Sequence, residues 1–354
     1  MLTAPGTWAQ HAIKNITAMQ VFRGFHYPGI APACALTIGN FDGVHRGHQA
    51  MLALLKNEAQ HRGVPSCVLT FEPHPRDYFA AALHKPELAP ARIGTLRDKL
   101  TELARCGVDQ TIVLPFDARL AGQSPDAFIR DVLQQGLGAR YVLVGDDFRF
   151  GTKRAGDYAM LDAAGASHGF DVARMNSYEV HGLRVSSSAV REALGQGDMA
   201  AAARLLGRPY SISGHVVHGR KLGRELGWPT LNLRFAHWKP AANGIFAVLV
   251  HGLGDKPLPG VANLGVRPSL DPNDVNGGRV LLETYCLEWP DSLGRDGAYG
   301  KIIRVELLHK LHDELRYVSL EALKTGIAKD CDDARTYFVT MHAETSRQTT
   351  RDRI

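Results

Sequence analysis

The chain has 354 residues, of which 45% are hydrophobic and 22% are charged, and its formal net charge is only +5. These values are those of an ordinary globular protein, and they give no reason to expect a basic nucleic-acid-binding surface. The chain is longer than a typical single domain, so two domains are expected.

The five cysteines are scattered and odd in number, and no Cys-x-x-Cys spacing occurs. We therefore expect neither a disulfide framework nor a zinc site. The N-terminus lacks the pattern of a secretory signal, and no apolar run approaches the length of a membrane span. The sequence thus predicts a cytoplasmic protein.

In the first half of the chain, short apolar strands alternate with amphipathic helices. This alternation predicts a parallel sheet with helices on both faces, a Rossmann-like α/β domain over residues 1–200. In such folds ligands bind beyond the carboxyl ends of the strands. We expect strands at residues 35–38, 66–71, 110–114, 141–144 and 171–175, and helices at residues 47–61, 95–106, 125–134 and 157–164.

After residue 186 the pattern changes. Two short helices (residues 188–194 and 200–206) lead to a turn at residues 207–209, where we expect the domain boundary. Apolar segments separated by glycine and proline then predict a small closed β-barrel over residues 207–337, which ends in a helix over residues 320–337. The polar residues 338–354 are predicted to form a flexible tail. The barrel strands are expected at residues 210–217, 231–233, 245–251, 260–264, 280–287 and 302–308.

Residues 37–48 are the most informative stretch and read Thr-Ile-Gly-Asn-Phe-Asp-Gly-Val-His-Arg-Gly-His. An apolar strand there passes through a glycine-rich turn to the start of a helix. Free backbone N–H groups and the helix dipole favour an anion at such a place. His45 and His48 lie nearly one turn apart and add donors on the same side. Two solvated residues that cap an ordinary helix are the alternative, but the strand–turn–helix context favours a phosphate site.

This stretch resembles the signature Gly-x-Phe-Asp-Gly-x-His-x-Gly-His of the bacterial FAD synthetases, a branch of the His-x-Gly-His nucleotidyltransferases. The resemblance implies that His45 and His48 meet the triphosphate of ATP during adenylyl transfer. It also implies that four residues of the turn contact the bound nucleotide or flavin: Gly39, Phe41, Asp42 and Gly43.

Three more motifs follow in the order of that family. Residues 71–76 match its Phe-x-Pro-His-Pro segment, which lies by the flavin, and residues 145–151 match its Gly-x-Asp-Phe-x-Phe-Gly motif. Residues 185–191 resemble Ile-Ser-Ser-Thr-x-Ile-Arg, which closes over the ATP phosphates. Taken alone, the three could be a stiff loop, an Asp-stabilised turn and a helix N-cap. The resemblance implies cofactor contacts from Phe71, His74, Asp147, Phe148, Ser187, Ser188 and Arg191.

In the second half, residues 219–232 combine glycines and basic residues with Thr230 and Asn232. Glycines let the main chain fold closely around phosphates, and a hydroxyl and an amide oxygen two residues apart are hard ligands suited to Mg²⁺. From the residues alone, a solvated basic hairpin is an equally good interpretation. The stretch resembles the Gly-Arg-x-Leu-Gly-Phe-Pro-Thr-Ala-Asn motif of riboflavin kinases, which implies that Thr230 and Asn232 bind MgATP. Further cofactor contacts are implied for Gly219, Arg224 and Gly227.

Glu283 is a carboxylate on an otherwise apolar strand, and an exposed strand residue would be the usual explanation. The resemblance to riboflavin kinases implies that Glu283 is the catalytic base, which deprotonates the ribityl hydroxyl as it attacks the γ-phosphorus of ATP. Asn263 and Arg267 are weaker site candidates. His312 stands where the family usually has arginine, so its contact with flavin or phosphate is left open.

Both halves thus resemble a bifunctional riboflavin kinase/FAD synthetase of bacteria. The resemblance implies that the barrel makes FMN from riboflavin and ATP, and that the N-terminal domain makes FAD from FMN and ATP with release of pyrophosphate. Two other functions were weighed. Adenylyl transfer to another acceptor, such as a pantetheine or nicotinamide nucleotide, does not account for the kinase-like barrel. A non-catalytic flavin-storage protein does not account for the histidine pair or the Mg²⁺ ligands. No nucleic-acid or membrane partner is expected.

Overall fold

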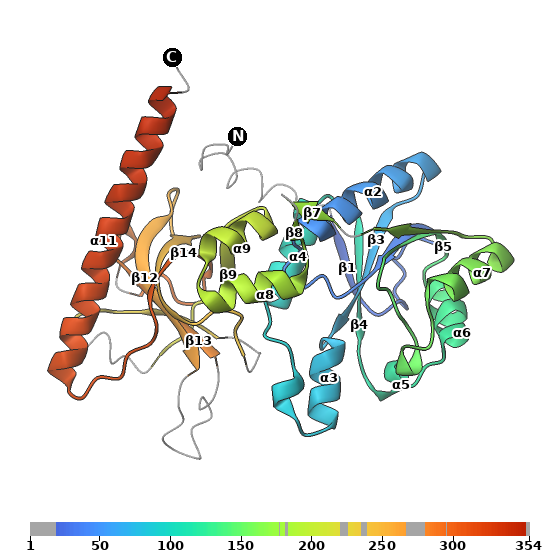
Figure 1. Ribbon diagram of the computed structural model, residues 1–354, viewed down its shortest axis with the longest axis horizontal. Helices are drawn as coiled ribbons and strands as arrows, with labels where there is room; N and C mark the ends of the chain where they lie inside the picture. The colour runs from blue at the N-terminus through green and yellow to red at the C-terminus, as the bar shows by residue number, and fades with distance from the viewer. Residues whose placement is uncertain are drawn as a thin grey trace. The chain divides into compact units, whose positions relative to one another are not determined.

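The computed structural model describes residues 19–176, 178–180, 183–219, 226–234, 239–266, 280–294 and 296–351 (Figure 1). The chain divides into two compact units. Unit 1 comprises Met1–Pro90 and Asp98–Ser187, and unit 2 comprises Ala91–Arg97 and Ser188–Ile354. We expected the first domain to extend to residue 200, whereas the structure groups almost all of helix α8 (Ser187–Gln196) and helix α9 (Met199–Leu206) with unit 2.

Unit 1 contains a six-stranded sheet in the order β1-β4-β3-β2-β5-β6, and every pairing is parallel. This confirms the predicted fold class. The chain runs outward from β2 to β3 and β4 on one side and to β5 and β6 on the other, so the strand order reverses between β2 and β5. Ligands bind at such a switch point in open α/β sheets. The strands are β1 (Gln20–Arg23), β2 (Cys34–Ile38), β3 (Ser66–Glu72), β4 (Gln110–Pro115), β5 (Ala139–Gly145) and β6 (Asp171–Met175).

Helices cover both faces of this sheet because neighbouring strand residues point to opposite sides. Val68 of β3 packs in the same core as Leu52 of the helix after β2. Leu69, the next residue, packs on the other face against Leu133 and Leu161. The helical elements of unit 1 are α2 (Arg46–Arg62), α3 (Pro75–Ala82), η1 (Pro86–Leu88), α4 (Leu96–Arg105), α5 (Ala118–Ala121), α6 (Pro125–Ala127), η2 (Phe128–Gly136), η3 (Thr152–Arg154) and α7 (Tyr158–His168).

Several of these elements differ from the predictions, and α5, η1 and η3 lie where no helix was expected. The expected helix at residues 125–134 is a short α6 followed by the π-helical η2. Helix α3 was not expected, because its prolines suggested a loop. Pro75 occupies the start of α3, where a missing N–H costs nothing. A short antiparallel pair, β7 (Glu179–Val180) and β8 (Leu183–Arg184), completes the described part of unit 1.

Unit 2 contains an antiparallel sheet in the order β10-β13-β12-β11-β14-β9. The backbone N–H of Val217, just after β9, donates to the carbonyl of Asn232 in β10 (2.9 Å), and this bridge joins the two edges of the sheet. The sheet is therefore a nearly closed barrel, as predicted. Its strands are β9 (Tyr210–His215), β10 (Leu231–Arg234), β11 (Gly244–His251), β12 (Leu258–Val266), β13 (Val280–Cys286) and β14 (Ile302–His312), with a short helical turn, η4 (Asp291–Leu293), before β14.

Helix α11 (Leu320–Arg351) packs against β11, β12 and β14 (Figure 1). We expected it to end at residue 337 and residues 338–354 to be a flexible tail, and that was wrong as far as Arg351. Neither glycine nor proline follows Gly326 in the sequence, so nothing interrupts the helix. Phe338 is also buried with Ala334 against Ala247, which anchors the helix beyond its expected end. None of the described helices combines the length and apolarity that a membrane span requires.

Candidate active sites

The turn after β2 has an unusual backbone. Phe41 (φ 49°) and Val44 (φ 39°) both have left-handed conformations, which a bulky or β-branched residue rarely adopts. Both side chains are buried. Strained residues of this kind cluster where a ligand or a reaction requires a fixed backbone. The turn is therefore a rigid platform at the carboxyl end of β2.

Two side-chain hydrogen bonds hold this turn in place. The hydroxyl of Thr70, in β3, donates to the carbonyl of Asn40 (3.3 Å). The hydroxyl of Ser187 donates to the carbonyl of Asp42 (3.0 Å), although the two residues are 145 positions apart. Ser187 was predicted to contact the cofactor, and the structure places it directly beside the turn.

His45 and His48 lie together at the start of α2. His45 is the N-cap residue, and its Nδ1 accepts a hydrogen bond from the backbone N–H of His48 (3.3 Å). The ring proton of neutral His45 therefore sits on Nε2. The two rings are stacked, with centroids 3.6 Å apart and an interplanar angle of 16°. A Cβ atom on Gly47 would lie 3.2 Å from the ring of His45, so glycine leaves the ring room to adopt this position.

The imidazole of His48 is held neutral. Burial, the His45 ring and the Lys99 ammonium, in that order, lower the pKa of His48 well below its usual range. Its Nδ1 is shielded from solvent and has no hydrogen-bond partner among the described residues. Because the unfolded chain takes up a proton near pH 6.5 and the folded chain does not, folding stability decreases as the pH falls below that value.

Lys99 is a site residue that sequence reasoning missed. Its side chain is only 3% exposed, and its Nζ donates to the hydroxyl of Thr70 (3.2 Å). Lys99 thus contacts the same Thr70 hydroxyl that donates to the carbonyl of Asn40, and its positive charge lowers the pKa of His48. The available signal was its spacing, because Lys99 precedes the buried Leu103 by one helical turn and so lies on the inward face of α4.

Replacing Lys99 with methionine keeps the length of the side chain but removes the charge. The pKa of His48 should then rise, so a larger fraction of His48 is protonated near neutral pH. If neutral His48 is the active form, kcat/KM for adenylyl transfer should fall at lower pH first, with an overall loss of about tenfold. The measurement is a pH–rate profile of FAD formation.

Lys85→Met, at an exposed position of the same unit, is the matched control and should leave the profile unchanged. A Lys99→Met profile that only scales down at every pH would contradict this role.

The other motifs of unit 1 lie at the same edge of the sheet. Gly39 follows β2 and donates to the carbonyl of Leu69 (3.0 Å), and Gly43 in the same turn has a φ of 82°. Phe71 lies near the end of β3, with its ring edge-on to that of Phe116 (centroids 5.8 Å apart). His74 caps α3 by accepting the N–H of Arg76 with its Nδ1 (3.1 Å).

The turn after β5 carries the last of these motifs. Phe148 stacks on Phe150 (centroids 5.5 Å apart), and Phe150 is buried against Phe128. Asp147 is exposed at the tip of the turn. Most of the predicted residues of the first domain that belong to unit 1 thus lie at or just after the ends of β2, β3 and β5, whereas Ser187 follows β8. Strands β2 and β5 flank the switch point.

Two predicted phosphate ligands belong to unit 2. Ser188 is exposed in the first turn of α8. One turn later, the Nε of Arg191 donates to the carbonyl of Ala91 (2.7 Å). The prediction that Ser188 and Arg191 act on the phosphates of ATP stays a prediction.

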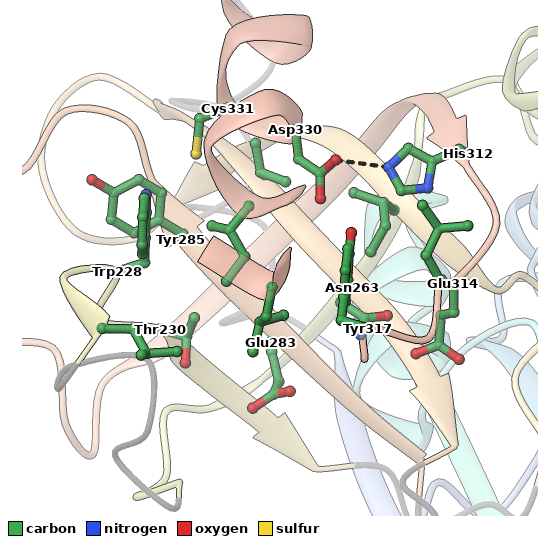
Figure 2. Close-up of a pocket in the computed structure, with 16 residues that line it drawn as sticks. Trp228, Thr230, Asn263, Glu283, Tyr285, His312, Glu314, Tyr317, Asp330 and Cys331 are labelled. Atoms are coloured by element: carbon green, nitrogen blue, oxygen red, sulfur yellow. Dashed lines mark hydrogen bonds and ion pairs between the residues drawn. The ribbon is translucent and has the colours of Figure 1, made fainter. Parts of the chain in front are cut away.

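Unit 2 contains a pocket of about 300 Å³ between one side of the barrel and the start of α11 (Figure 2). Its walls come from segments far apart in the sequence, and they mix apolar and polar side chains. Two of the predicted site residues, Thr230 and Glu283, line it. The labelled lining residues in Figure 2 are Trp228, Thr230, Asn263, Glu283, Tyr285, His312, Glu314, Tyr317, Asp330 and Cys331.

Strand register places Glu283 in a row of polar side chains. Glu283 of β13 lies opposite Asn232 of β10 on one side and opposite Asn263 of β12 on the other. In Figure 2, Glu283 lies between Thr230 and Asn263. A carboxylate between the predicted nucleotide-binding residues and an open pocket can act as a base toward a ligand in that pocket.

Asn232 has an oriented carboxamide. Its Nδ2 donates to the carbonyl of Thr230 (3.1 Å), which turns Oδ1 the other way. This Oδ1 is buried and has no hydrogen-bond partner among the described residues. A Cβ atom on Gly219 would lie 2.7 Å from Nδ2, so a larger residue there would displace this carboxamide. Gly227 has a φ of 97°. The predicted contacts Arg224 and Arg267 lie outside the described residues.

His312, which replaces the arginine usual in the family, joins the barrel to the helix that closes the pocket. Its Nε2 and Oδ1 of Asp330 in α11 are 2.7 Å apart, as the dashed line in Figure 2 shows. Partial burial opposes protonation, yet the hydrogen bond to Asp330 raises the pKa of His312. Sequence reasoning missed the lining residues Tyr317, Asp330 and Cys331, because no local pattern shows which face of α11 meets the barrel.

Comparisons with known proteins agree with this geometry. The family model for FAD synthetase matches residues 28–189, and the model for riboflavin kinase matches residues 206–338. The chain is 45% identical over 322 residues to the bifunctional riboflavin kinase/FMN adenylyltransferase of Escherichia coli (strain K12). The matched region covers 90% of this chain and 98% of the relative. The chain belongs to the bifunctional riboflavin kinase/FMN adenylyltransferase family.

A second relative shows the same full-length match. The Haemophilus influenzae protein with the same name is 41% identical over 321 residues, covering 90% of this chain and 99% of the relative. A crystal structure titled as a macrolide-efflux protein from Streptococcus pneumoniae has a TM-score of 0.69 at 24% identity, covering 90% of this chain and 99% of that one, and it supports the fold alone.

Membership of this family confirms the predicted function. The protein is a transferase with a riboflavin kinase and an FMN adenylyltransferase activity, and ATP is its co-substrate. The two other functions weighed from the sequence are therefore not needed.

Proposed function

We propose that the two activities are divided between two domains, with FMN adenylylation over residues 1–200, which include residues 188–200 of unit 2, and riboflavin phosphorylation over residues 207–337. The observation that carries this division is Glu283, a carboxylate that lines the pocket of the barrel. The kinase reaction requires a base beside a flavin-sized cavity, whereas the adenylylation reaction requires mainly anion-binding groups. Unit 1 offers the latter at the start of α2.

In adenylyl transfer, a phosphate oxygen of FMN attacks the α-phosphorus of ATP and pyrophosphate leaves. The protein needs no covalent intermediate and acts by positioning the reactants and neutralising charge. We assign the leaving pyrophosphate to the N-terminus of α2 together with the rings of His45 and His48. At most one of two rings stacked 3.6 Å apart can readily carry a charge, so the pair donates hydrogen bonds without repelling itself.

In riboflavin phosphorylation, Glu283 removes the proton of the terminal ribityl hydroxyl while its oxygen attacks the γ-phosphorus of ATP, and ADP leaves. The position of Glu283 between Asn232 and Asn263 supports this role, because it lies between the proposed nucleotide ligands and the pocket. The flavin ring would occupy the pocket of about 300 Å³, whose lining includes Trp228, Tyr285 and Tyr317.

We include Mg²⁺ among the kinase cofactors. The residues present fit such an ion, because Oδ1 of Asn232 is a buried acceptor without a partner among the described residues, and Thr230 lines the pocket beside it. Amide and hydroxyl oxygens are hard ligands, and Mg²⁺ is usually held by few protein ligands together with nucleotide phosphates. When bound, the ion would neutralise charge on the β- and γ-phosphates.

Replacing Asn232 with alanine removes the buried acceptor. The Mg²⁺ concentration for half-maximal kinase activity should then rise by about tenfold or more, as for other changes around metal ligands. The measurement is a Mg²⁺ titration of FMN formation at fixed ATP. The Mg²⁺ dependence of FAD formation from supplied FMN is the internal control and should not change. An unchanged kinase titration curve would remove Asn232 from the proposed site.

One assay tests the whole proposal. Purified protein incubated with riboflavin, ATP and Mg²⁺ should yield FMN first and then FAD, which chromatography separates from riboflavin. FMN without FAD, or no conversion of riboflavin, would contradict it. We also place the protein in the cytoplasm, where its five free cysteines would stay reduced.

A further inference from the structure

Asn263 is a pocket residue whose role the preceding assignment leaves open. It lies on β12 and lines the same pocket as Glu283. Its Oδ1 is shielded from solvent, and no described residue donates a hydrogen bond to it. A buried carboxamide oxygen that lacks a donor is destabilising, so an acceptor of this kind beside a pocket calls for a donor from a bound ligand or an ordered water.

The strand register fixes where that donor must lie. Asn263 faces Glu283 across β12 and β13, and residues directly opposite in an antiparallel pair have Cβ atoms about 4.5–5.5 Å apart. The ligand group that reaches Asn263 is therefore a near neighbour of the group that reaches Glu283. The next residue in the row, Ile245 of β11, is apolar and also lines the pocket. Beyond Ile245 the row continues to His312 of β14, whose Nε2 is paired with Asp330.

The chemistry of the substrate then restricts the donor. Riboflavin carries a chain of hydroxyls next to the terminal hydroxyl that reacts, and each hydroxyl can donate one hydrogen bond. The carbonyl groups of the flavin ring only accept, and the one ring donor, N3–H, lies on the opposite side of the ring system from the ribityl chain, so it does not lie beside Glu283 when the terminal hydroxyl does. Because the hydroxyls follow one another along the chain, a secondary hydroxyl lies within reach of Asn263 when the terminal hydroxyl lies at Glu283.

We propose that Asn263 is a specificity-determining residue of the kinase site, which accepts a hydrogen bond from a secondary hydroxyl of the ribityl chain. The contact distinguishes a flavin with a polyol side chain from one with a plain alkyl alcohol. It also holds the terminal hydroxyl at the carboxylate of Glu283. This inference rests on the proposed role of Glu283 as the base, and the experiment separates the two.

The experiment compares two substrates with three forms of the full-length protein. The first substrate is riboflavin. The second is a riboflavin analogue in which a 5-hydroxypentyl chain replaces the ribityl chain, so it keeps the methylated ring and the terminal hydroxyl but lacks the secondary hydroxyls. The proteins are the unmodified chain, Asn263→Leu, and the control Ile245→Val. Leucine keeps the number and branching of the side-chain heavy atoms of asparagine and removes the acceptor. A cooperative thermal unfolding transition reports that each variant is folded, and FAD formation from supplied FMN, which is assigned to unit 1, is an internal control for that unit alone.

The unmodified protein should prefer riboflavin, and Asn263→Leu should reduce the ratio of the two kcat/KM values by about tenfold or more, since a site built to bind a hydroxyl rejects the analogue that lacks it. The kcat/KM value for riboflavin should fall, and the value for the analogue should stay nearly unchanged. Ile245→Val should keep the ratio. Equal loss on both substrates, or no loss on either, would overturn the inference. Neither outcome bears on the base, which Glu283→Gln tests separately.

Discussion

Replacing His48 with alanine should stop the protein from making FAD while it still makes FMN. His48 is stacked on His45 at the start of α2, where we propose that the pyrophosphate leaves, and the change removes one of the two stacked imidazoles there. Loss of one such group reduces kcat by about 10²–10³-fold. Incubation with riboflavin and ATP should therefore accumulate FMN, and the measurement is the ratio of FMN to FAD over time.

The same helix offers a matched control. His61 lies near the end of α2 and is exposed, so His61→Ala should leave both activities as they are. An equal loss of kinase and adenylyltransferase activity in His48→Ala would contradict the division of the two reactions. Wild-type FAD formation in His48→Ala would remove the histidine pair from the reaction.

Replacing Glu283 with glutamine should have the opposite result. Glutamine keeps the shape of the side chain but cannot take the proton of the ribityl hydroxyl. A positioned general base contributes about 10²–10⁴-fold, so riboflavin phosphorylation should fall by that factor with little change in the KM for riboflavin. Supplied FMN should still be converted to FAD at the normal rate. Both rates are measured by chromatography of the flavins.

Glu288→Gln is the control for this change, because Glu288 is exposed just after the same strand. Mixing the His48→Ala and Glu283→Gln proteins should restore the conversion of riboflavin to FAD, since each supplies the reaction that the other lacks. Retained kinase activity in Glu283→Gln would rule out its role as the base.

The sequence predicted five of the six strands of the first sheet, β2 to β6, because their apolar runs are continuous and bounded by glycine and proline, whereas the residues of β1 indicate only a lead-in or a short strand. Strand β2 begins one residue before its predicted start, and β6 matches its prediction. The histidine pair was found for a similar reason, since its residues are adjacent along one short segment. Local patterns thus located the parts of each site that are contiguous in the chain.

Features that depend on distant segments were missed. Lys99 reads as one more charge on an amphipathic helix, and only the packing of α4 shows that it is buried beneath Thr70. The side of the pocket formed by α11 depends on how that helix crosses the barrel, which its own periodicity does not encode. The π-helical η2 was missed because its five-residue hydrogen bonding is not visible in a pattern with 3.6 residues per turn.

The bridge that joins the two edges of the barrel ends on Asn232. The backbone carbonyl of this residue receives the amide proton of Val217, while its side chain is the proposed ligand of the nucleotide-bound cation. A ligand that binds only when the hydrogen bond between Val217 and Asn232 is formed stabilises that form of the barrel by its binding free energy. Hydrogen exchange at the Val217 amide would therefore slow as MgATP saturates the kinase, so a single backbone proton can report the occupancy of this site.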